Sequence, residues 1–402
     1  MKILQIASKF PYPPTDGGRI SAYGVTKYLS KIGHKIDFVA YLNNDSKEMF
    51  YSKMNEICTP HIINFKTDNS KLGALRNLFS SIPYNISKYY SEELKRWLKN
   101  YFKSNKPDII HITTLHMAWC VDYIKEFTSV PVILREENLE MEIMRRFSEN
   151  EKNYFLKIYS YLQYKKLHKY EPEMCEKFDC CVMISNKDKE MLERFNRQNY
   201  IKAIPVGIES ELLSKKKSIE ENHSLAHIGT MDWYPNYDSL SWFINDVLPD
   251  LVEQFPELKL YIYGGGKSKL NIPKALKDNI IVKGYVDDLW QELLAKNLAI
   301  VPLRIGGGIR VKILEMLAAG QNVISTSIGS EGIDVKDETH ILLANNKDEF
   351  IEKITYFLNG KYDSKTIAVN GRNFIKENYT WEKIADSFDE LYNELCRKSN
   401  EK

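Results

Sequence analysis

The sequence lacks the features that define several common classes of protein. No apolar run approaches the ~18 residues needed to span a membrane. The start of the chain has neither the apolar length nor the small-residue cleavage site of a signal peptide. The six cysteines form no CxxC pair and no Cys/His spacing typical of zinc sites, and the adjacent Cys180 and Cys181 are expected to be buried thiols of a strand. We therefore expect a cytoplasmic protein in a reducing compartment.

Motifs for common cofactors are also missing. The run YIYGGGKSK contains Gly264 and Gly266 but not the third glycine of GxGxxG, which argues against an NAD-dependent enzyme. No Asp-x-Asp triplet occurs, and the vicinal Asp287 and Asp288 stand where acids commonly cap a helix. We therefore predict neither a bound cofactor nor a metal ion.

The length of 402 residues suits two domains of about 200 residues each. Short apolar runs alternate with helical patterns almost throughout, which is typical of parallel sheets with helices on both faces. The polar stretch 207–223 separates two such series. We predict an α/β protein with two Rossmann-like domains, residues 1–206 and 207–378, followed by a C-terminal helix in residues 379–402. The predicted strands are 2–7, 35–41, 60–65, 108–112, 131–135, 179–184, 200–205, 224–229, 258–263, 279–283, 298–302, 321–326 and 339–344.

The most informative stretch is Leu298–Gly320, LAIVPLRIGGGIRVKILEMLAAG. A short apolar run is followed by three glycines and then by a helical pattern that ends at Gly320. A glycine loop between a strand and a helix N-terminus lets backbone N–H groups approach a phosphate. The stretch therefore favours a phosphate-containing ligand; an ordinary strand–helix unit with a solvated face is the alternative.

Charged residues of this stretch favour the same ligand. Arg310 and Lys312 fall in the first predicted helical turn, where the helix macrodipole disfavours each cation by about 0.3–1 kcal/mol. Two cations placed there indicate a bound anion. Glu315 follows on the same side as Lys312, where its carboxylate is suited to accept hydrogen bonds from a ribose diol.

GGGIRVKILEMLAAG resembles the donor-site signature of family 4 glycosyltransferases of the GT-B fold, especially the bacterial branch that makes exopolysaccharides and other surface glycans. The resemblance extends over HIGTMDWYPNYDSLSWFINDVLP (227–249) and QNVISTSIGSEGID (321–334), and it is looser in the first half of the chain. It implies two Rossmann-like domains facing a cleft, with the C-terminal helix crossing back to the first. It also implies that the first domain binds the acceptor, that the second binds a nucleotide sugar, and that Glu315 binds the ribose.

Two places depart from the family pattern. Most members have a second glutamate where this chain has Gly307, and the usual Arg and Lys of the first strand–helix turn are replaced around Thr230 and Pro235. We infer that Arg310 and Lys312 supply the missing charge and act as catalytic residues on the leaving diphosphate. The other donor-binding residues that the resemblance indicates are Gly17, Gly18, Gly229, Asn236, Gly264, Val286, Gly307, Gly308 and Ile309.

The first half offers candidates for contacts with the sugar and the acceptor. In TTLHMAW, His116 matches the histidine that contacts the transferred sugar in glycogen synthases and related retaining enzymes, and it is predicted to be catalytic. His111, at the carboxyl end of the preceding strand, is a weaker candidate, and a structural role is the alternative for both. The loop Asp16–Arg19 resembles the family's glycine pair, although an Asp-Gly turn capping a helix fits equally well. The predicted acceptor-binding residues are Arg19, Glu137 and Asn138.

Together these features predict a retaining, metal-independent glycosyltransferase that uses a UDP-, GDP- or TDP-linked sugar. The resemblance implies front-face transfer, in which the leaving phosphate takes the acceptor proton. The predicted acceptor is a glycan or a lipid-linked glycan of cell-surface polysaccharide synthesis. Two alternatives remain open: a nucleotide-sugar epimerase, and a partner subunit that binds nucleotide without turnover, which Gly307 would suggest.

Charge is distributed unevenly along the chain. Residues 1–205 contain 32 Lys and Arg against 24 Asp and Glu, whereas the remainder contains 24 against 30. The segment Lys71–Lys106 combines eight basic residues with two acids and many aromatic residues, which is typical of a segment lying on an anionic membrane. The alternative is a pair of amphipathic helices whose apolar faces turn inward onto the first sheet. Nucleic acid is not an expected partner, because no RNA-binding motif is present and the second half is acidic.

Overall fold

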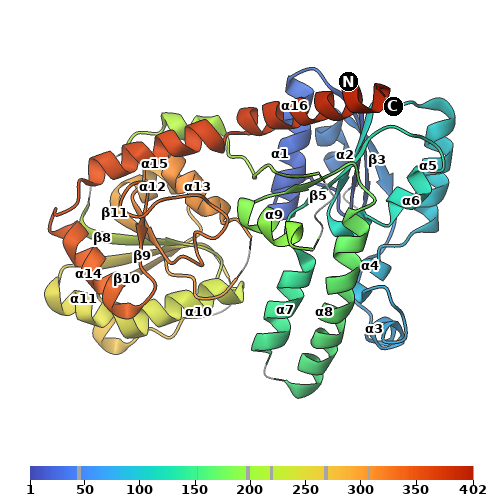
Figure 1. The fold of residues 1–402 in the computed structure, drawn as a ribbon. Helices are drawn as coiled ribbons and strands as arrows, with labels where there is room; N and C mark the ends of the chain where they lie inside the picture. Colours follow the sequence, from blue (N-terminus) through green and yellow to red (C-terminus); the bar gives the residue numbers. More distant parts are fainter. Residues whose placement is uncertain are drawn as a thin grey trace. The chain divides into compact units, whose positions relative to one another are not determined.

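The structure is a computed structural model that describes residues 1–402 apart from 43–46, 152, 196–199, 218–220, 267–269, 307 and 402. The chain forms two compact units, Met1–Gly207 with Trp381–Lys402, and Ile208–Thr380. Each unit holds a parallel sheet flanked by helices (Figure 1). The predicted class, α/β with two Rossmann-like domains, is confirmed. In the residues that the structure describes, no helix is both long and apolar enough to cross a membrane.

The first unit is built on a parallel sheet. Its strands are β1 (Lys2–Ala7), β2 (Lys35–Tyr41), β3 (Thr59–Ile63), β4 (Ile109–Thr113), β5 (Val132–Glu136), β6 (Cys180–Met183) and β7 (Ile201–Ala203). Its helices are α1 (Gly17–Lys31), α2 (Lys47–Asn55), α3 (Lys71–Asn77), α4 (Tyr84–Ser87), α5 (Glu92–Ser104), η1 (Leu115–Met117), α6 (Cys120–Ile124), α7 (Glu140–Asn150), α8 (Tyr154–Cys175), α9 (Asn186–Glu193) and α16 (Trp381–Asn400). Within the described residues the strand order is β3-β2-β1-β4-β5-β6-β7, so β4 lies at the centre.

The central strands are buried on both faces. Every residue of β4, β5 and β6 is buried, which is why these segments are continuous apolar runs and not alternating patterns. Cys180 and Cys181 are buried in β6, as predicted, and the structure records both as free thiols. Polar groups of this sheet therefore reach solvent mainly where strands end.

The C-terminal helix α16 completes the first unit. The Trp381 ring occupies the space where a Cβ at Gly24 or Gly207 would stand, and Phe388 and Tyr392 are buried beneath the helix. This helix therefore packs against α1 and the sheet of the first unit, as the predicted fold requires.

The second unit repeats the architecture. Its strands are β8 (Glu221–Ile228), β9 (Lys259–Tyr263), β10 (Ile280–Gly284), β11 (Lys296–Val301), β12 (Val323–Ser325) and β13 (Leu342–Leu343), and its described residues place them in the order β10-β9-β8-β11-β12-β13, all parallel. Its helical segments are η2 (Ser210–Ser214), α10 (Tyr234–Trp242), η3 (Phe243–Val247), α11 (Leu248–Gln254), η4 (Lys274–Leu276), α12 (Leu289–Leu294), α13 (Val311–Ala318), α14 (Lys347–Leu358) and α15 (Ser364–Asn378). All thirteen predicted strands overlap observed ones, although most of their ends differ by one to three residues.

The basic segment Lys71–Lys106 divides into two parts with different environments. In α5, Leu94, Leu98 and Tyr101 are buried in the core of the first unit, so the apolar face of this helix turns inward, as the alternative interpretation holds. In and after α3, by contrast, Leu72, Leu75 and Phe79 are exposed. That N-terminal part of the segment therefore presents apolar side chains to solvent, whereas α5 does not.

Candidate functional site

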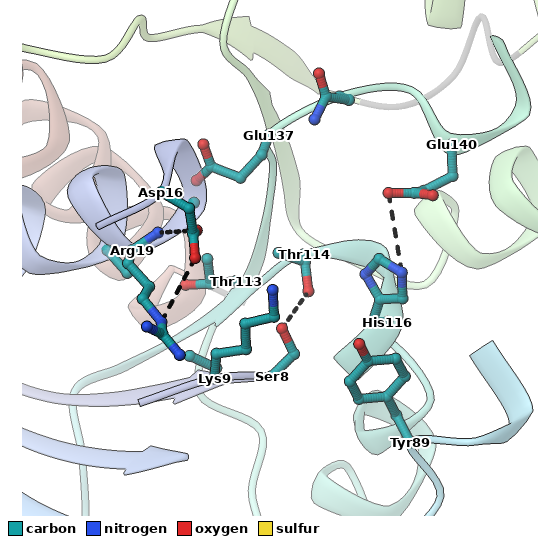
Figure 2. Close-up of a pocket in the computed structure, with 14 residues that line it drawn as sticks. Ser8, Lys9, Asp16, Arg19, Tyr89, Thr113, Thr114, His116, Glu137 and Glu140 are labelled. Atoms are coloured by element: carbon teal, nitrogen blue, oxygen red, sulfur yellow. Dashed lines mark hydrogen bonds and ion pairs between the residues drawn. The ribbon is translucent and has the colours of Figure 1, made fainter. Parts of the chain in front are cut away.

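A pocket in the first unit gathers several of the predicted residues. It has a volume of about 210 Å³ and opens where β1, β4 and β5 end and α1 begins. Figure 2 shows Arg19 of α1, His116 of η1 and Glu137 of the loop after β5 around it. Its lining also includes Gly18 and Asn138. Carboxyl ends of parallel strands are the usual ligand-binding edge of an open α/β sheet, so the predicted candidates of this unit meet where chemistry is expected.

His116 owes its position to a turn directly after β4. Thr114 has φ 71° and ψ 143°, a left-handed conformation that is costly for a β-branched residue. Its backbone N–H donates to the Arg135 carbonyl at 2.7 Å, which fixes the turn to the neighbouring strand. The chain then enters η1 and presents His116 to the pocket, where its Nε2 lies 3.9 Å from the Glu140 carboxylate and its ring 4.8 Å from the Tyr89 ring.

The environment of His116 keeps the imidazole neutral. Burial lowers its pKa, and Lys88 and Lys9 lower it further, whereas Glu140 acts in the opposite direction. A neutral imidazole beside a carboxylate can donate or accept a hydrogen bond with a sugar hydroxyl.

His111 lies elsewhere. Its Nδ1 is 2.7 Å from the Tyr392 hydroxyl of α16, its ring is buried, and burial lowers its pKa to about 3. The structure places it in the core between β4 and α16, and it does not line the pocket.

The loop before α1 both caps the helix and lines the pocket. Asp16 is the N-cap and accepts a hydrogen bond from the Arg19 backbone N–H at 3.1 Å, while the Arg19 guanidinium lies 3.5 Å from the same carboxylate and donates to Thr15. Gly17 is the first residue of α1, and Gly18 follows it at the pocket. The two interpretations of this loop are therefore compatible.

Glu137 is held by a buried arginine. Arg135 donates to Glu137 Oε1 at 3.3 Å and also binds the Ser21 hydroxyl and the Ile204 and Pro205 carbonyls. Burial raises the pKa of Glu137, whereas Arg135 lowers it. Glu137 is thus a positioned carboxyl group, while Glu136 points into the core, where Cys175 donates to it at 3.3 Å.

Sequence reasoning missed several residues of this pocket. Lys9, Tyr89 and Glu140 line it, and Glu171, 31 positions after Glu140, accepts hydrogen bonds from the Glu140 and Met141 backbone N–H groups at 2.8 Å each. Glu171 thereby caps the N-terminus of α7 and orients Glu140 toward His116. Lys9 and Glu140 follow strand ends, which is a signal that could have identified them; Glu171 lies inside a helix and gives no such signal.

In the second unit, the glycine loop and α13 bring the predicted cations to one place. Arg310 is the N-cap of α13, with an extended backbone, so it precedes the first helical turn in which it was predicted to lie. The residue is 7% exposed, and its guanidinium lies 5.4 Å from the Trp233 ring and donates to the Gly308 carbonyl at 2.9 Å. Gly308, at φ 77°, and Ile309 form the turn into the helix. Gly307 lies outside the described residues.

Lys312 and Glu315 share one side of α13. Lys312 Nζ donates to the Ile228 carbonyl at 2.8 Å and to Asn236 Oδ1 at 3.1 Å; burial and then Arg310 lower its pKa to about 7. Burial raises the pKa of Glu315 to about 7. In the part of the chain that the structure describes, the Glu315 carboxylate has no hydrogen bond to protein. Glu315 is thus a carboxylate to which no described protein group donates a hydrogen bond. It lies three residues from Lys312, whose ammonium group loses its proton readily.

The loops after β8 and β9 are closely interlocked. A Cβ at Gly229 would overlap the Asn236 amide, and one at Gly264 (φ 119°) would overlap the Gly229 carbonyl. Asn236 is buried and donates to the Thr230 carbonyl at 3.0 Å. These residues fix the strand ends on which Lys312 rests, which is a structural reason for both glycines.

The loop after β10 holds the last predicted donor residue. Val286 is half-buried beside Tyr285, which is 88% exposed. Asp288 is the N-cap of α12 and accepts from the Gln291 N–H at 3.0 Å, so the cap predicted for the vicinal acids is confirmed. Among the described residues, no three His, Cys, Asp or Glu side chains are grouped to hold a metal ion.

Comparisons with known proteins agree with this architecture. Residues 15–212 match the profile of Glycosyltransferase Family 4, and residues 222–360 match Glycosyl transferases group 1. An uncharacterized 44.6 kDa protein in the cps region of Klebsiella pneumoniae is 24% identical and covers 96% of this chain and 98% of its own. The two profiles follow one another along the chain, and the protein is a glycosyltransferase of GT-B type.

Solved structures show the same fold. Sucrose-phosphate synthase from Thermosynechococcus elongatus superimposes with a TM-score of 0.71 at 15% identity, covering 98% of this chain and 99% of its own. Anabaena HepE, solved in complex with UDP, gives a TM-score of 0.69 at 13% identity, covering 98% and 100%. The fold of two Rossmann-like units is therefore shared with these structures, as the sequence predicts.

Proposed function

We propose that this glycosyltransferase takes a sugar from a nucleoside-diphosphate sugar and transfers it with retention and without a metal ion. Glu315 carries the proposal. Its carboxylate is costly to ionise in its place, because burial raises its pKa to about 7, and the structure describes no protein donor that offsets this cost. Hydrogen bonds from the two hydroxyls of a ribose would do so, at about 1.5–3 kcal/mol for a charged acceptor.

The cations beside Glu315 suit a diphosphate. Arg310 and Lys312 lie at the start of α13, where the free backbone N–H groups and the macrodipole also favour an anion. Structures of HepE hold UDP or UDP-glucose, which supports a nucleotide sugar as the donor here. The positive charges of Arg310 and Lys312 would stabilise the leaving diphosphate, as a metal ion does in other transferases.

The pocket of the first unit is the proposed place of the acceptor and the transferred sugar. His116, held next to Glu140 and Tyr89, is proposed to contact the sugar, and Arg19, Glu137 and Asn138 to contact the acceptor. The relative in the Klebsiella cps region supports a glycan or lipid-linked glycan of surface polysaccharide synthesis as the acceptor.

The test begins with thermal-shift titration of the protein with UDP-, GDP- and TDP-sugars. Glu315→Gln is expected to weaken binding of the preferred nucleotide sugar by 10- to 100-fold, that is about 1.4–2.8 kcal/mol. Glu352→Gln, on the exposed side of α14, is the matched control and leaves affinity unchanged. Unchanged affinity in Glu315→Gln would remove the basis of the donor assignment.

Product analysis then tests the reaction. The proposal requires an α-linked product from an α-linked donor and activity that persists in excess chelator. Release of the nucleotide with an isomerised free sugar and no acceptor product would favour an epimerase. Tight nucleotide binding without any transfer would favour a partner subunit that lacks turnover.

A further inference from the structure

The α7–α8 hairpin of the first unit carries several large apolar side chains on the outside. Around the turn that joins the two helices, Tyr154 is 71% exposed and Phe155 82%, and Phe147 and Ile158 are also exposed. Figure 1 shows the hairpin extending from the sheet of this unit. A soluble helix pair normally turns such residues inward, and exposed contiguous apolar surface commonly marks an interaction site.

The inner side of the hairpin is polar where its outer side is apolar. Ser148 and Ser160 are buried, and each hydroxyl donates to a carbonyl of its own helix, at 2.8 Å. Gln163, also buried, is bonded to Asn77 and to the Tyr84 N–H. The outward apolar residues are thus not needed to hold the two helices together, and a different contact must account for them.

The part of α8 that precedes Glu171 is basic. Residues 154–170 contain four lysines and no acid. Lys157 and Lys165 are exposed, and Lys165 lies 5.5 Å from the Tyr161 ring. On α7, Glu142 pairs with Arg145 and Arg146, and Glu149 pairs with Arg145. The exposed aromatic and apolar side chains at the start of α8 are therefore flanked by the exposed lysines Lys157 and Lys165.

Helix α3 extends this surface. Lys166 of α8 donates to the Asn77 carbonyl at 2.6 Å, which places α3 beside α8 (Figure 1). Leu72, Leu75 and Phe79, the last 94% exposed, lie in α3 and the turn after it. The exposed part of the basic segment and the hairpin are thus neighbours in space although about 80 residues apart in sequence.

We propose that the hairpin face, defined as Phe147, Tyr154, Phe155, Lys157, Ile158 and Lys165, docks on an anionic membrane surface. Apolar and aromatic side chains flanked by lysines are suited to the boundary between lipid headgroups and acyl chains, where lysine side chains extend to the phosphates. A second copy of the chain fits less well, because a twofold interface places the same lysines of both copies close together. This inference does not depend on the identity of the donor.

The test is flotation of the purified full-length protein with vesicles of equal parts phosphatidylglycerol and phosphatidylcholine, compared with phosphatidylcholine alone. Wild-type protein is expected to float with the anionic vesicles only, and to be released as salt increases. Phe155→Ser/Ile158→Ser is expected to weaken partitioning by more than about 10-fold. Lys157→Gln/Lys165→Gln is expected to weaken it by about 25-fold, at about 5-fold for each cation.

Two controls separate the hairpin from general effects. Lys99→Gln/Lys103→Gln removes the same charge from α5, whose apolar face is buried, and Val369→Ser removes an exposed apolar side chain from α15; both are expected to float like wild type. Nucleotide affinity, measured without vesicles, stays unchanged in the hairpin variants, so failure of the docking proposal and failure of the donor assignment are distinguishable. Absence of flotation at low salt, or flotation that the hairpin variants do not alter, would overturn the proposal. A dimer detected by light scattering that dissociates in Phe155→Ser/Ile158→Ser would also overturn the proposal, because it would assign the hairpin face to a second copy of the chain.

Discussion

Donor affinity is expected to depend on pH through two groups on α13. Lys312 and Glu315 are separated by less than one helical turn, and burial brings the pKa of each to about 7 from opposite directions. The proposed complex requires Lys312 protonated, to pair with the diphosphate, and Glu315 ionised, to accept from the ribose. At neutral pH, Lys312 is therefore deprotonated in a fraction of the free protein, and Glu315 is protonated in a fraction of it.

The sign of each effect follows from linkage. Above pH 7, free Lys312 loses its proton and the bound state must recover it, so affinity falls as pH rises. Below pH 7, free Glu315 gains a proton that the bound state must release, so affinity falls as pH decreases. The expected profile is a bell centred near pH 7.

The magnitude follows from the two pKa values. If both groups are held fully in the required form in the complex, the dissociation constant at pH 6 or pH 8 is about 3-fold larger than at pH 7, and at pH 5 or pH 9 about 25-fold larger. Lys312→Gln is expected to remove the dependence above pH 7, and Glu315→Gln the dependence below it, each with weaker binding at pH 7.

Isothermal titration with the preferred nucleotide sugar from pH 5 to 9 measures this profile. A nucleotide sugar is used because its esterified phosphates do not titrate in this range. Titrations at pH 8 in two buffers with different ionisation enthalpies should reveal proton uptake by wild type and none by Lys312→Gln. A flat profile between pH 6 and 9, or a profile that neither variant alters, would refute the reasoning.

Three further predictions concern other groups. His116→Ala should abolish sugar transfer and leave nucleotide affinity nearly unchanged; an active variant would return His116 to a structural role. Arg310→Ala should lower kcat by more than it raises the KM for the donor, because charge on the diphosphate develops in the transition state; a rise in KM alone would assign it to ground-state binding. Glu136→Gln should raise the unfolding midpoint at pH 8 and change it little at pH 5. Burial raises the pKa of Glu136 and of its neighbour Glu171, so that their ionisation costs stability as pH rises. Equal effects at both pH values would contradict this.

The sheets were predictable because their signal is local. Parallel strands buried on both faces leave short continuous apolar runs, and each predicted run overlaps a strand of the structure. Strand ends were less predictable: the predicted strand 339–344 contains only the pair Leu342–Leu343 as strand. Where a strand ends depends on its neighbours in the sheet, and those neighbours are distant in sequence.

The candidate site was predictable only in part. Glycine loops, cations and strand-end polar residues are visible in the sequence and indicated Arg19 and Glu137. The family resemblance of TTLHMAW indicated His116, and the structure brings all three to one pocket. The groups that set the chemistry of these residues come from elsewhere: Arg135 reaches Glu137 only because it also binds the carbonyls after β7, and Glu140 reaches His116 because Glu171 caps α7. Such contacts have no local pattern.

The two histidines of β4 and η1 show how little separates a core residue from a candidate catalytic one. His111 and His116 lie five positions apart, so composition and spacing treat them alike. What distinguishes them is the turn at Thr114, whose left-handed backbone ends the strand and redirects the chain. His111, before that turn, faces α16 and the Tyr392 hydroxyl. His116, after the turn, faces the pocket. Because the turn is anchored to the Arg135 carbonyl and the same arginine holds Glu137, β5 positions both the histidine loop and the carboxylate opposite it. The end of β5 is therefore the element on which the geometry of the proposed sugar pocket depends.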